Sequence, residues 1–443
     1  MPRDWAAVPY TRGEGAQVLF EDQELDFPHY QTWTKELLNA PFVYVNGDVT
    51  QETLEQWWST IADDGYLVLK TSPVEVVCAL MECVGTWDLV NKDDCLVFQK
   101  KPDGHTLSCL DSVKPLKTAC VVRFGGFGDM IQAACVFPQL KAQGFEITVM
   151  TTERGQEILE HDPNVDKFII QDDDQVPNME LGPYWNYWRE KFDRFINLSM
   201  SIEGACLIIP DDFRTHWTKQ SIHRFCNHNY LEVQSDVAGV PLNAKGSKFY
   251  PSEPEKEWAS KELEPLKGKQ VIMWSLSGSA LHKCSPYTDN VIARVLTTYP
   301  EAHFILVGDH ACKLLEQGWE AEERIWCRSG EYSIRETLTL AQQVDIVMGP
   351  ETGVLNSVGM EKVAKVIMLS HSSKENLTKH WINTTALLPV KTPCYPCHRL
   401  HMGRGTCPVV ELGPEKVPAA ACTAELDTDR IYKAVRDCLR LAA

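Results

Sequence analysis

The chain contains 443 residues, with 43 Lys and Arg against 61 Asp and Glu, so its formal net charge is −18 with neutral His. At roughly 150 residues per domain, this length predicts about three domains, and an apolar share of 44% with a charged share of 23% is typical of globular proteins. The acidic balance argues against a general nucleic-acid coat or a basic membrane-surface protein. No apolar run reaches the roughly 18 to 20 residues that a membrane helix needs, and the polar start at 1–15 does not resemble a secretory signal.

Sixteen cysteines are spread through the chain, most of them singly inside apolar runs such as 118–122. Without an export signal, cysteines in such runs are typical of small buried side chains that stay reduced. We therefore expect a cytoplasmic protein.

The first quarter of the chain begins with a leader, 1–24, that carries no periodic pattern. The pattern then predicts a strand at 42–46, a helix at 50–62, a strand at 66–70, a helix at 73–84 and a hairpin at 87–98. This order resembles the C-terminal half of a class I methyltransferase, in which a phrase like Ala62-Asp-Asp-Gly-Tyr-Leu-Val-Leu69 precedes the fifth strand. The glycine-rich loop that binds S-adenosylmethionine in that family has no counterpart in 1–41. The resemblance implies that 25–101 is a truncated methyltransferase-like module, a relic or a docking site for a partner; a small independent α/β domain is the alternative.

Beyond a predicted linker at 102–117, apolar runs alternate with helical patterns. This alternation predicts a doubly wound parallel sheet over 118–245, because strands buried on both faces read as continuous apolar runs. Its strands are expected at 118–124, 145–150, 167–170 and 195–198, with a helix from 129 to about 143. The aromatic cluster at 184–192 is interpreted as core packing, with stacking on an acceptor as the alternative.

A polar stretch at 243–269 separates this unit from a second Rossmann-like unit over 246–425, whose first strand is expected at 270–274. Later strands are expected at 302–307, 344–348 and 363–368, and a C-terminal helix in 426–443. The predicted fold class is therefore α/β, with two doubly wound parallel-sheet domains and a small N-terminal α/β module.

The first candidate site is the loop Gly125-Gly126-Phe-Gly128-Asp129 between a buried strand and a helix. Glycines let a substrate approach the backbone closely, and a helix N-terminus favours anionic groups. A dinucleotide fingerprint needs a third glycine where this chain has Ile131. For Asp129, a plain interaction with the helix dipole is the alternative.

A second and a third loop carry polar residues after later strands. In 275–286, Ser277, Gly278 and Ser279 could surround a phosphate, and Lys283 could neutralise a diphosphate; a polar surface loop is the alternative. In 349–356, the chain again passes from a strand into a helix, at the edge where ligands bind in open α/β sheets.

Together these phrases resemble the ADP-heptose lipopolysaccharide heptosyltransferases of glycosyltransferase family nine, which have the two-domain GT-B fold. The resemblance covers about 117–440. The matching positions are the Gly-Asp loop at Gly128 and Asp129, the serine-rich loop followed by Lys283, the strand-end Gly308, and Glu351, Thr352, Gly353 and Asn356 for the family's Asp-Ser-Gly-Pro-x-His phrase.

The resemblance implies an inverting, metal-independent transfer of a sugar from a nucleotide-diphosphate donor to an acceptor hydroxyl. Asp129 is the candidate base, and Lys283 with the N–H groups around Thr352 and Gly353 would stabilise the departing diphosphate. Because Glu351, Thr352 and Asn356 depart from the family phrase, heptose is not carried over as the donor sugar. The acceptor stays open: a lipopolysaccharide-type glycan, a protein side chain or a hydroxymethylated base of viral DNA.

Four cysteines near the C-terminus form the last motif: Cys394, Cys397, Cys407 and Cys422. A Cys-x-x-Cys followed by two further cysteines has the spacing of a structural zinc site, with His398 and His401 as substitute ligands. Free or disulfide-paired cysteines are the alternative. No cofactor is expected for catalysis.

The sequence is also consistent with two other functions. One is a catalytically inactive binding or scaffold protein on a GT-B frame, suggested by the changes at Glu351 and Asn356. The other is a sugar-nucleotide epimerase, which would turn over the donor alone.

Overall fold

The computed structural model describes residues 18–19, 40–45, 58, 61–69, 87–91, 96–100, 117–172, 175–202, 213–278, 280–398, 407–414 and 416–442. They belong to two compact units, Met1–Leu116 and Lys117–Ala443, and each is described by itself. No helix in these ranges is both long enough and apolar enough to cross a membrane.

The first unit contains a five-stranded sheet in the order β1-β2-β3-β5-β4. Strands β1 (Val18–Leu19), β2 (Ala40–Val45) and β3 (Ile61–Leu69) run parallel, whereas β4 (Trp87–Asn91) and β5 (Leu96–Lys100) pair antiparallel. The predicted strands and the hairpin are present. The last two positions of the helix expected at 50–62 belong to β3 instead. Most of that helix, and all of the helix expected at 73–84, lie outside the described residues.

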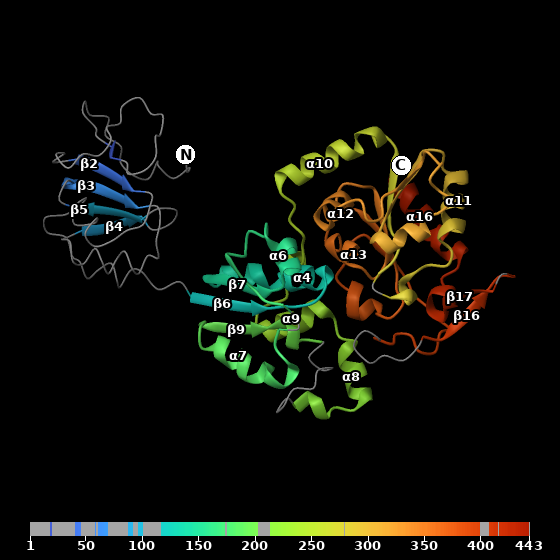
Figure 1. Cartoon of the computed structure of the whole chain (residues 1–443), viewed down its shortest axis with the longest axis horizontal. Helices are drawn as coiled ribbons and strands as arrows, with labels where there is room; N and C mark the ends of the chain where they lie inside the picture. Colours follow the sequence, from blue (N-terminus) through green and yellow to red (C-terminus); the bar gives the residue numbers. More distant parts are fainter. Residues whose placement is uncertain are drawn as a thin grey trace. The chain divides into compact units, whose positions relative to one another are not determined.

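The second unit begins with a four-stranded parallel sheet in the order β8-β7-β6-β9 (Figure 1). We call this part, residues 117–246, the N lobe. Its strands are β6 (Lys117–Val122), β7 (Phe145–Thr151), β8 (Lys167–Ile170) and β9 (Arg194–Asn197), close to the four that the apolar runs predict. Besides the helices that directly follow β6, the N lobe contains α6 (Glu153–Leu159), α7 (Leu181–Arg189), α8 (Lys219–Cys226) and α9 (Tyr230–Ala238).

The helix expected from 129 to about 143 is not continuous. It is divided into α4 (Phe127–Ala133), a 3-10 turn (Ala134–Val136) and α5 (Phe137–Ala142). Pro138 lies in the first turn of α5. Proline lacks the N–H that would bond to Ala134 in a continuous helix, so the helix restarts at this point.

The C lobe, residues 253–442, contains a six-stranded parallel sheet in the order β12-β11-β10-β13-β14-β15. Its strands are β10 (Gln270–Ser275), β11 (Ala302–Val307), β12 (Ile325–Cys327), β13 (Ile346–Pro350), β14 (Ala364–Met368) and β15 (Thr384–Leu387). Its helices are α10 (Glu253–Leu263), α11 (Thr288–Thr298), α12 (Ile334–Ala341), α13 (Gly353–Ser357), α15 (Ala421–Ala424) and α16 (Thr428–Ala442). The α/β fold class with two parallel-sheet domains is confirmed.

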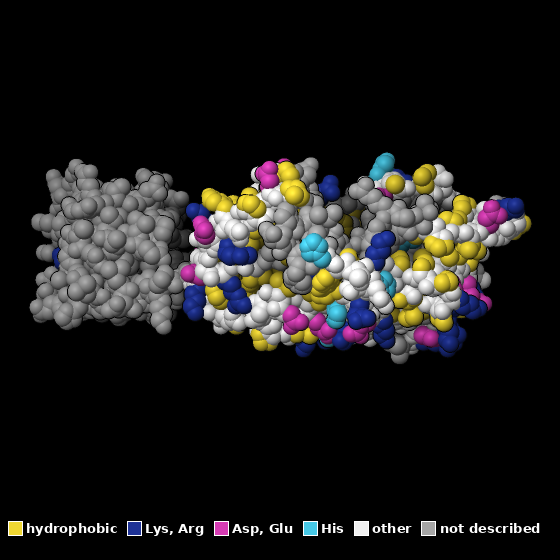
Figure 2. Space-filling model, turned by 90° about the horizontal axis from the view of Figure 1, so that it is seen from below, with side chains coloured by type: hydrophobic (Ala, Val, Ile, Leu, Met, Phe, Trp, Pro, Cys, Tyr) yellow, Lys and Arg dark blue, Asp and Glu magenta, His cyan; other side chains and the backbone are white. Residues whose placement is uncertain are grey.

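A small antiparallel hairpin, β16 (Val409–Leu412) and β17 (Val417–Ala420), lies beside this sheet. In the space-filling view it projects at the right-hand end (Figure 2), and Val409 and Val417 are exposed on it. The sequence pattern does not predict this hairpin.

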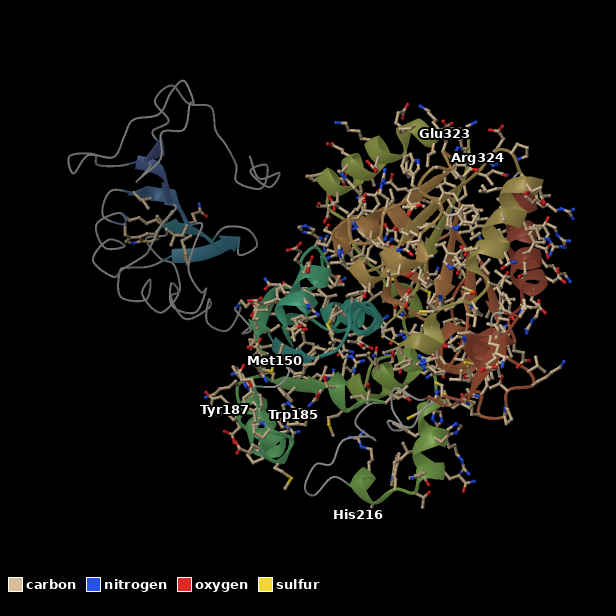
Figure 3. The ribbon with its side chains drawn as sticks, turned by 45° about the vertical axis from the view of Figure 1, so that its right-hand side comes forward. Met150, Trp185, Tyr187, His216, Glu323 and Arg324 are labelled. Atoms are coloured by element: carbon tan, nitrogen blue, oxygen red, sulfur yellow. The ribbon has the colours of Figure 1, made fainter. Side chains whose placement is uncertain are left out.

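The aromatic residues of α7 pack on one face of the N-lobe sheet, as the core interpretation predicts. Tyr184 and Trp188 contact the cluster of Cys120, Val122 and Met150. Tyr187 is the exception, because 56% of its surface is exposed (Figure 3).

One apolar core runs through both lobes. It includes Met130 and Ile131 of α4 together with Val354 and Leu355 of α13. Helices α4 and α13 are therefore packed against each other where the lobes meet (Figure 1). This packing places the loops at the carboxyl ends of both sheets next to each other.

Candidate functional site

The loop after β6 presents Asp129 in the first turn of α4. Its Oδ2 accepts a hydrogen bond of 2.8 Å from the backbone N–H of Gly126. Gly125 has φ 124°, which disfavours any residue with a side chain, and a Cβ there would lie 2.5 Å from Asp129 Oδ2. The glycines thus let the chain turn tightly around this carboxylate, which keeps a third of its surface exposed (33%).

Arg123 is a site residue that the sequence motifs do not identify. It follows β6 directly, is only 2% exposed, and its Nη2 donates to Asp129 Oδ1 at 2.9 Å. The signal in the sequence is a single charged residue within the apolar run 118–124, but the run does not indicate its partner.

Close backbone contact between the lobes depends on two glycines. A Cβ on Gly128 would lie 2.8 Å from Asn356 Nδ2, and a Cβ on Gly353 would overlap the ring of Phe127. The first turns of α4 and α13 can approach this closely only without side chains at these positions.

Asn356 joins the two lobes rather than standing open to a ligand. Its Nδ2 donates to the carbonyl of Thr352 at 3.0 Å, and its Oδ1 accepts from Gln132 Nε2 at 3.0 Å. Gln132 and Asn356 are both buried. Gln132 is a second residue that the sequence motifs miss, because 224 positions separate the pair.

The serine-rich loop after β10 lies against the same region. A Cβ on Gly278 would overlap Lys283, so this glycine makes room for the lysine side chain. Ser277 donates to the carbonyl of Gly278 at 3.0 Å, and Ser275 Oγ lies 3.3 Å from Thr352 Oγ1. Ser279 lies outside the described residues.

Lys283 is buried, with 7% of its surface exposed, and its Nζ donates to the carbonyl of Glu351 at 2.9 Å. Burial lowers the pKa of Lys283, while the negative charges of Glu351 and Asp129 oppose that shift. Lys283 from the C lobe and Asp129 from the N lobe are therefore within electrostatic reach of each other. The fold brings together these two predicted site residues, which are 154 positions apart in the sequence.

Glu351 turns its carboxylate into the protein. Oε1 accepts hydrogen bonds from the N–H groups of Ser370 (2.6 Å), His371 (3.0 Å) and Ser372 (3.1 Å), and Oε2 accepts from the Ser370 hydroxyl. Burial opposes ionisation, but the charges of His371 and Lys283 and the bonds from Ser370 outweigh it, so the pKa of Glu351 is lowered. Its side chain therefore braces the loop 349–353 against the loop after β14.

Two buried histidines beside Glu351 are further residues that the motifs miss. The rings of His282 and His371 meet edge to face with centroids 5.4 Å apart. His282 belongs to the serine-rich loop and His371 to the loop after β14, so the pair joins two loops of the C-lobe sheet edge.

Gly308, at the end of β11, packs directly on Cys312. A Cβ at this position would overlap the side chain of Cys312. The structure gives Gly308 a packing role, and its predicted contact with a donor stays a prediction.

The cysteines of the C-terminal motif differ in exposure. Cys394 is exposed, Cys397 and Cys407 are half-buried and Cys422 is buried. Burial raises the pKa of Cys422 to about 12, and nearby Cys407 and Cys397 contribute to the rise. Among the residues that the structure describes, no three His, Cys, Asp or Glu side chains are placed to hold a metal ion. His401 lies outside them.

The comparison with known proteins rests on solved structures. No protein-family model and no curated protein matches the chain. A family 9 glycosyltransferase from Veillonella parvula has a TM-score of 0.53 at 14% identity, over 74% of this chain and 98% of that chain. ADP-heptose lipopolysaccharide heptosyltransferase II from E. coli has a TM-score of 0.50 at 14% identity, over 74% of this chain and 100% of that chain.

These similarities confirm the resemblance to family nine at the level of the fold. The matched share of the chain is close in size to the second unit, Lys117–Ala443. The methyltransferase-like character of 25–101 stays a prediction.

Proposed function

We propose that the protein is a glycosyltransferase that moves a sugar from a nucleotide-diphosphate donor to an acceptor hydroxyl. The observation that carries the proposal is that Lys283 of the C lobe lies within electrostatic reach of Asp129 of the N lobe, beside the contact of α4 with α13. A buried cation suits a leaving diphosphate, and a partly exposed carboxylate suits a hydroxyl proton. The GT-B fold of the second unit supports the same conclusion.

The donor diphosphate would lie against Lys283, over the glycine and serine backbone of 277–278 and the N–H groups of Thr352 and Gly353. A phosphate charge beside Lys283 would offset the desolvation that now lowers the pKa of this lysine. Positive charge that is fixed before the reaction stabilises the leaving group without reorganisation.

In the transfer step, the acceptor oxygen attacks the anomeric carbon from the face opposite the diphosphate. The new C–O bond forms as the bond to the diphosphate breaks, and that electron pair leaves with the phosphate. The acceptor proton moves to the carboxylate of Asp129, and the anomeric configuration inverts. Each oxygen of Asp129 accepts one hydrogen bond from the protein, so one lone pair on each remains for a substrate hydroxyl.

Lys283 supplies the charge that a divalent ion supplies in other transferases, so we propose that the transfer proceeds in EDTA. Glu351 and Asn356 direct their side chains to other protein groups. We therefore assign them to the shape of the donor loop and leave the sugar and the base open. The acceptor class also stays open among glycans, modified DNA bases and proteins. We propose a cytoplasmic location, where nucleotide sugars are made and free thiols persist.

A thermal-shift panel tests this proposal, with ADP, UDP, GDP, CDP and dTDP and their common sugars, with and without EDTA. A ligand that binds the folded state raises the melting temperature. We expect a rise with one nucleotide family that EDTA does not change and that Lys283→Met removes. The control Lys374→Met removes an exposed lysine and should keep the shift. A flat panel would contradict the proposal and favour the binding-protein alternative; donor turnover without an acceptor would favour an epimerase.

Docking of a partner through 25–101 stays a proposal. A structural zinc at Cys394, Cys397, Cys407 and Cys422 also stays a proposal, and it rests on the spacing of these cysteines. Its test is the metal content of the purified protein. The proposal expects about one zinc per chain, lost in Cys397→Ser and kept in Cys327→Ser, which removes a half-buried thiol elsewhere in the C lobe. A metal-free protein with normal stability would contradict it.

A further inference from the structure

We infer that Arg123 is the positioning residue of the reaction: it holds the carboxylate of Asp129 towards the acceptor and away from Lys283. The inference rests on the proposed function, because it assigns a partner to the base of that transfer. It is carried by a buried ion pair at the carboxyl end of β6.

The two side chains form a fixed pair. Arg123 Nη2 donates to Asp129 Oδ1 at 2.9 Å, while Nη1 donates to the carbonyl of Leu198 at 3.3 Å. The guanidinium is thus held between the loop that follows β9 and the first turn of α4. Because its fork is planar, these two bonds also set the orientation of the carboxylate plane.

The backbone beneath Arg123 is fixed on both sides. Its own N–H donates to Met150 of β7 at 3.0 Å, and the next N–H, of Phe124, donates to Ser199 Oγ at 3.0 Å. The end of β6 is therefore tied to both neighbouring segments. A guanidinium that extends from this backbone can orient its partner without moving during turnover.

The burial of Arg123 is costly for the fold alone. Only 2% of its surface is exposed, and its neighbours in β6, Val121 and Val122, are fully buried. Removing a charged group from water costs several kcal/mol unless an opposite charge and hydrogen bonds compensate. A hydrophobic residue would fill this place more cheaply, so the arginine indicates a role beyond packing.

That role follows from the second cation at the site. Lys283 attracts the same carboxylate, since the charge of Asp129 opposes the fall in the pKa of Lys283. If Asp129 turned to pair with Lys283, its carboxylate would point away from the acceptor hydroxyl. Arg123 and the Gly126 N–H engage one oxygen each and leave Asp129 partly exposed. The pair thus keeps the proton acceptor separate from the cation of the leaving group.

A double-mutant cycle tests the inference on the full-length protein, with Arg123→Met, Asp129→Asn and the combination. We expect Arg123→Met to lower kcat about 100-fold, the scale of a misplaced reacting group, with the donor-induced thermal shift unchanged. In the Asp129→Asn background, Arg123→Met should have no further effect on the residual rate, because its only route to the reaction is gone. Arg123→Lys keeps the charge without the fork and should recover part of kcat.

Arg194→Met is the matched control. Arg194 is the first residue of β9, whereas Arg123 contacts the loop after the last residue of β9, so this change removes a guanidinium at the opposite end of the strand. Its effect on kcat should be small and should multiply with that of Asp129→Asn. If Arg123→Met does not fold, the same cycle is run with Arg123→Lys.

If the effects of Arg123→Met and Asp129→Asn on kcat multiply in the double mutant of an active enzyme, this inference is overturned and the proposed function stands. Loss of the donor-induced shift in Arg123→Met would also overturn it, because Arg123 would then act on donor binding. A wild-type protein that binds no sugar nucleotide and transfers no sugar would overturn the proposed function and this inference together.

Discussion

At the scale of single residues, Asp129 is the side chain whose loss should separate chemistry from binding. Asp129→Asn keeps the size of the group but cannot accept the acceptor proton, so we expect transfer to fall by about 10²- to 10⁴-fold. Lys283 and the donor loop are unchanged, so the donor-induced thermal shift should persist. The measurement is the rate of product formation beside the thermal shift. Asp236→Asn, on the exposed side of α9, is the control and should behave as wild type. Full activity in Asp129→Asn would remove this residue from the mechanism.

Lys365, at the start of β14, gives a prediction about pH. It is fully buried, and its Nζ donates to the carbonyls of Glu361 (2.7 Å) and Val363 (2.8 Å). Burial lowers the pKa of Lys365 to about 8, whereas an unfolded lysine titrates near 10.4. Between these values the unfolded chain binds more protons, so this residue adds stability as pH rises from about 8 to 10.4.

Urea unfolding at pH 7, 8, 9 and 10 measures this effect as the difference between wild type and Lys365→Met. We expect the difference to shift in favour of wild type across that range. Lys362→Met, which removes an exposed lysine of the same turn, should give a difference that does not change with pH. A constant difference for Lys365→Met as well would mean that this lysine keeps its proton up to pH 10.

At the scale of elements, the contact of α4 with α13 depends on the missing side chain of Gly353. A Cβ there would overlap the ring of Phe127, so Gly353→Ala should force the first turns of the two helices apart. Overpacking of this kind costs about 1 to 3 kcal/mol, and it should also lower transfer, because Asp129 and Lys283 lie on either side of the contact. Thermal unfolding and activity assays measure both effects.

The matched control is Gly182→Ala in α7, where a Cβ meets no atom within 4 Å. There alanine should be neutral or slightly stabilising, since glycine is a poor helix former. Phe127→Leu should restore part of the stability of Gly353→Ala by making room. If Gly353→Ala were as stable and active as wild type, the contact would be adaptable and would not set the site.

The elements also show what the sequence pattern can and cannot predict. Strands that are buried on both faces are visible as apolar runs, and β8 and β11 match their predicted ranges at both ends. The sequence predicts one helix after β6, but the missing N–H of Pro138 divides it. The residues of the hairpin β16–β17 are largely exposed, so the sequence carries no strong periodic signal for it.

Some residues of the candidate site can likewise be predicted from the sequence, and others cannot. Asp129 and Lys283 stand in local motifs at the ends of strands, so the sequence could nominate them. Arg123, Gln132 and His371 act through partners that are distant or that a motif does not specify. The pairing of Gln132 with Asn356 follows from how the two lobes are packed, and the contact of His371 with His282 follows from how strands are ordered in the C-lobe sheet; no local pattern encodes either. Arg123 lies only six positions from Asp129, but the apolar run around it does not indicate this partner.

At the scale of the second unit, Arg335 ties both lobes to the segment between them. From α12 its Nη1 donates to the carbonyl of Glu157 in the N lobe at 2.6 Å. Its Nη2 donates to Tyr250, in the connecting segment, at 3.1 Å and to Glu255 Oε2 of α10 at 2.9 Å. Arg335 is 6% exposed, so its loss leaves buried acceptors without donors.

We therefore expect Arg335→Met to lower the free energy of unfolding by about 3 to 5 kcal/mol, the usual cost of breaking a buried ion pair on one side. The contrast is Arg328→Met, which breaks the half-exposed pairs with Glu331 and Glu262 and should cost about 0 to 1 kcal/mol. Urea unfolding of the three proteins measures both changes. Equal effects of the two substitutions would contradict a clamp at Arg335.

The partner carboxylate gives this clamp a pH dependence. Burial alone would raise the pKa of Glu255, but hydrogen bonds from Arg335 and Ser252 outweigh it and lower the pKa to about 2. The folded pKa is below the unfolded value, so the contribution is complete above about pH 4.3 and is lost as pH falls towards 2. Glu255→Gln should thus be less stable than wild type at pH 7, and the gap should narrow from pH 5 to pH 3. A gap that stays constant over this range would show that the carboxylate charge does not stabilise the joint between the lobes, and that α10 is held there by its packing on α12 alone.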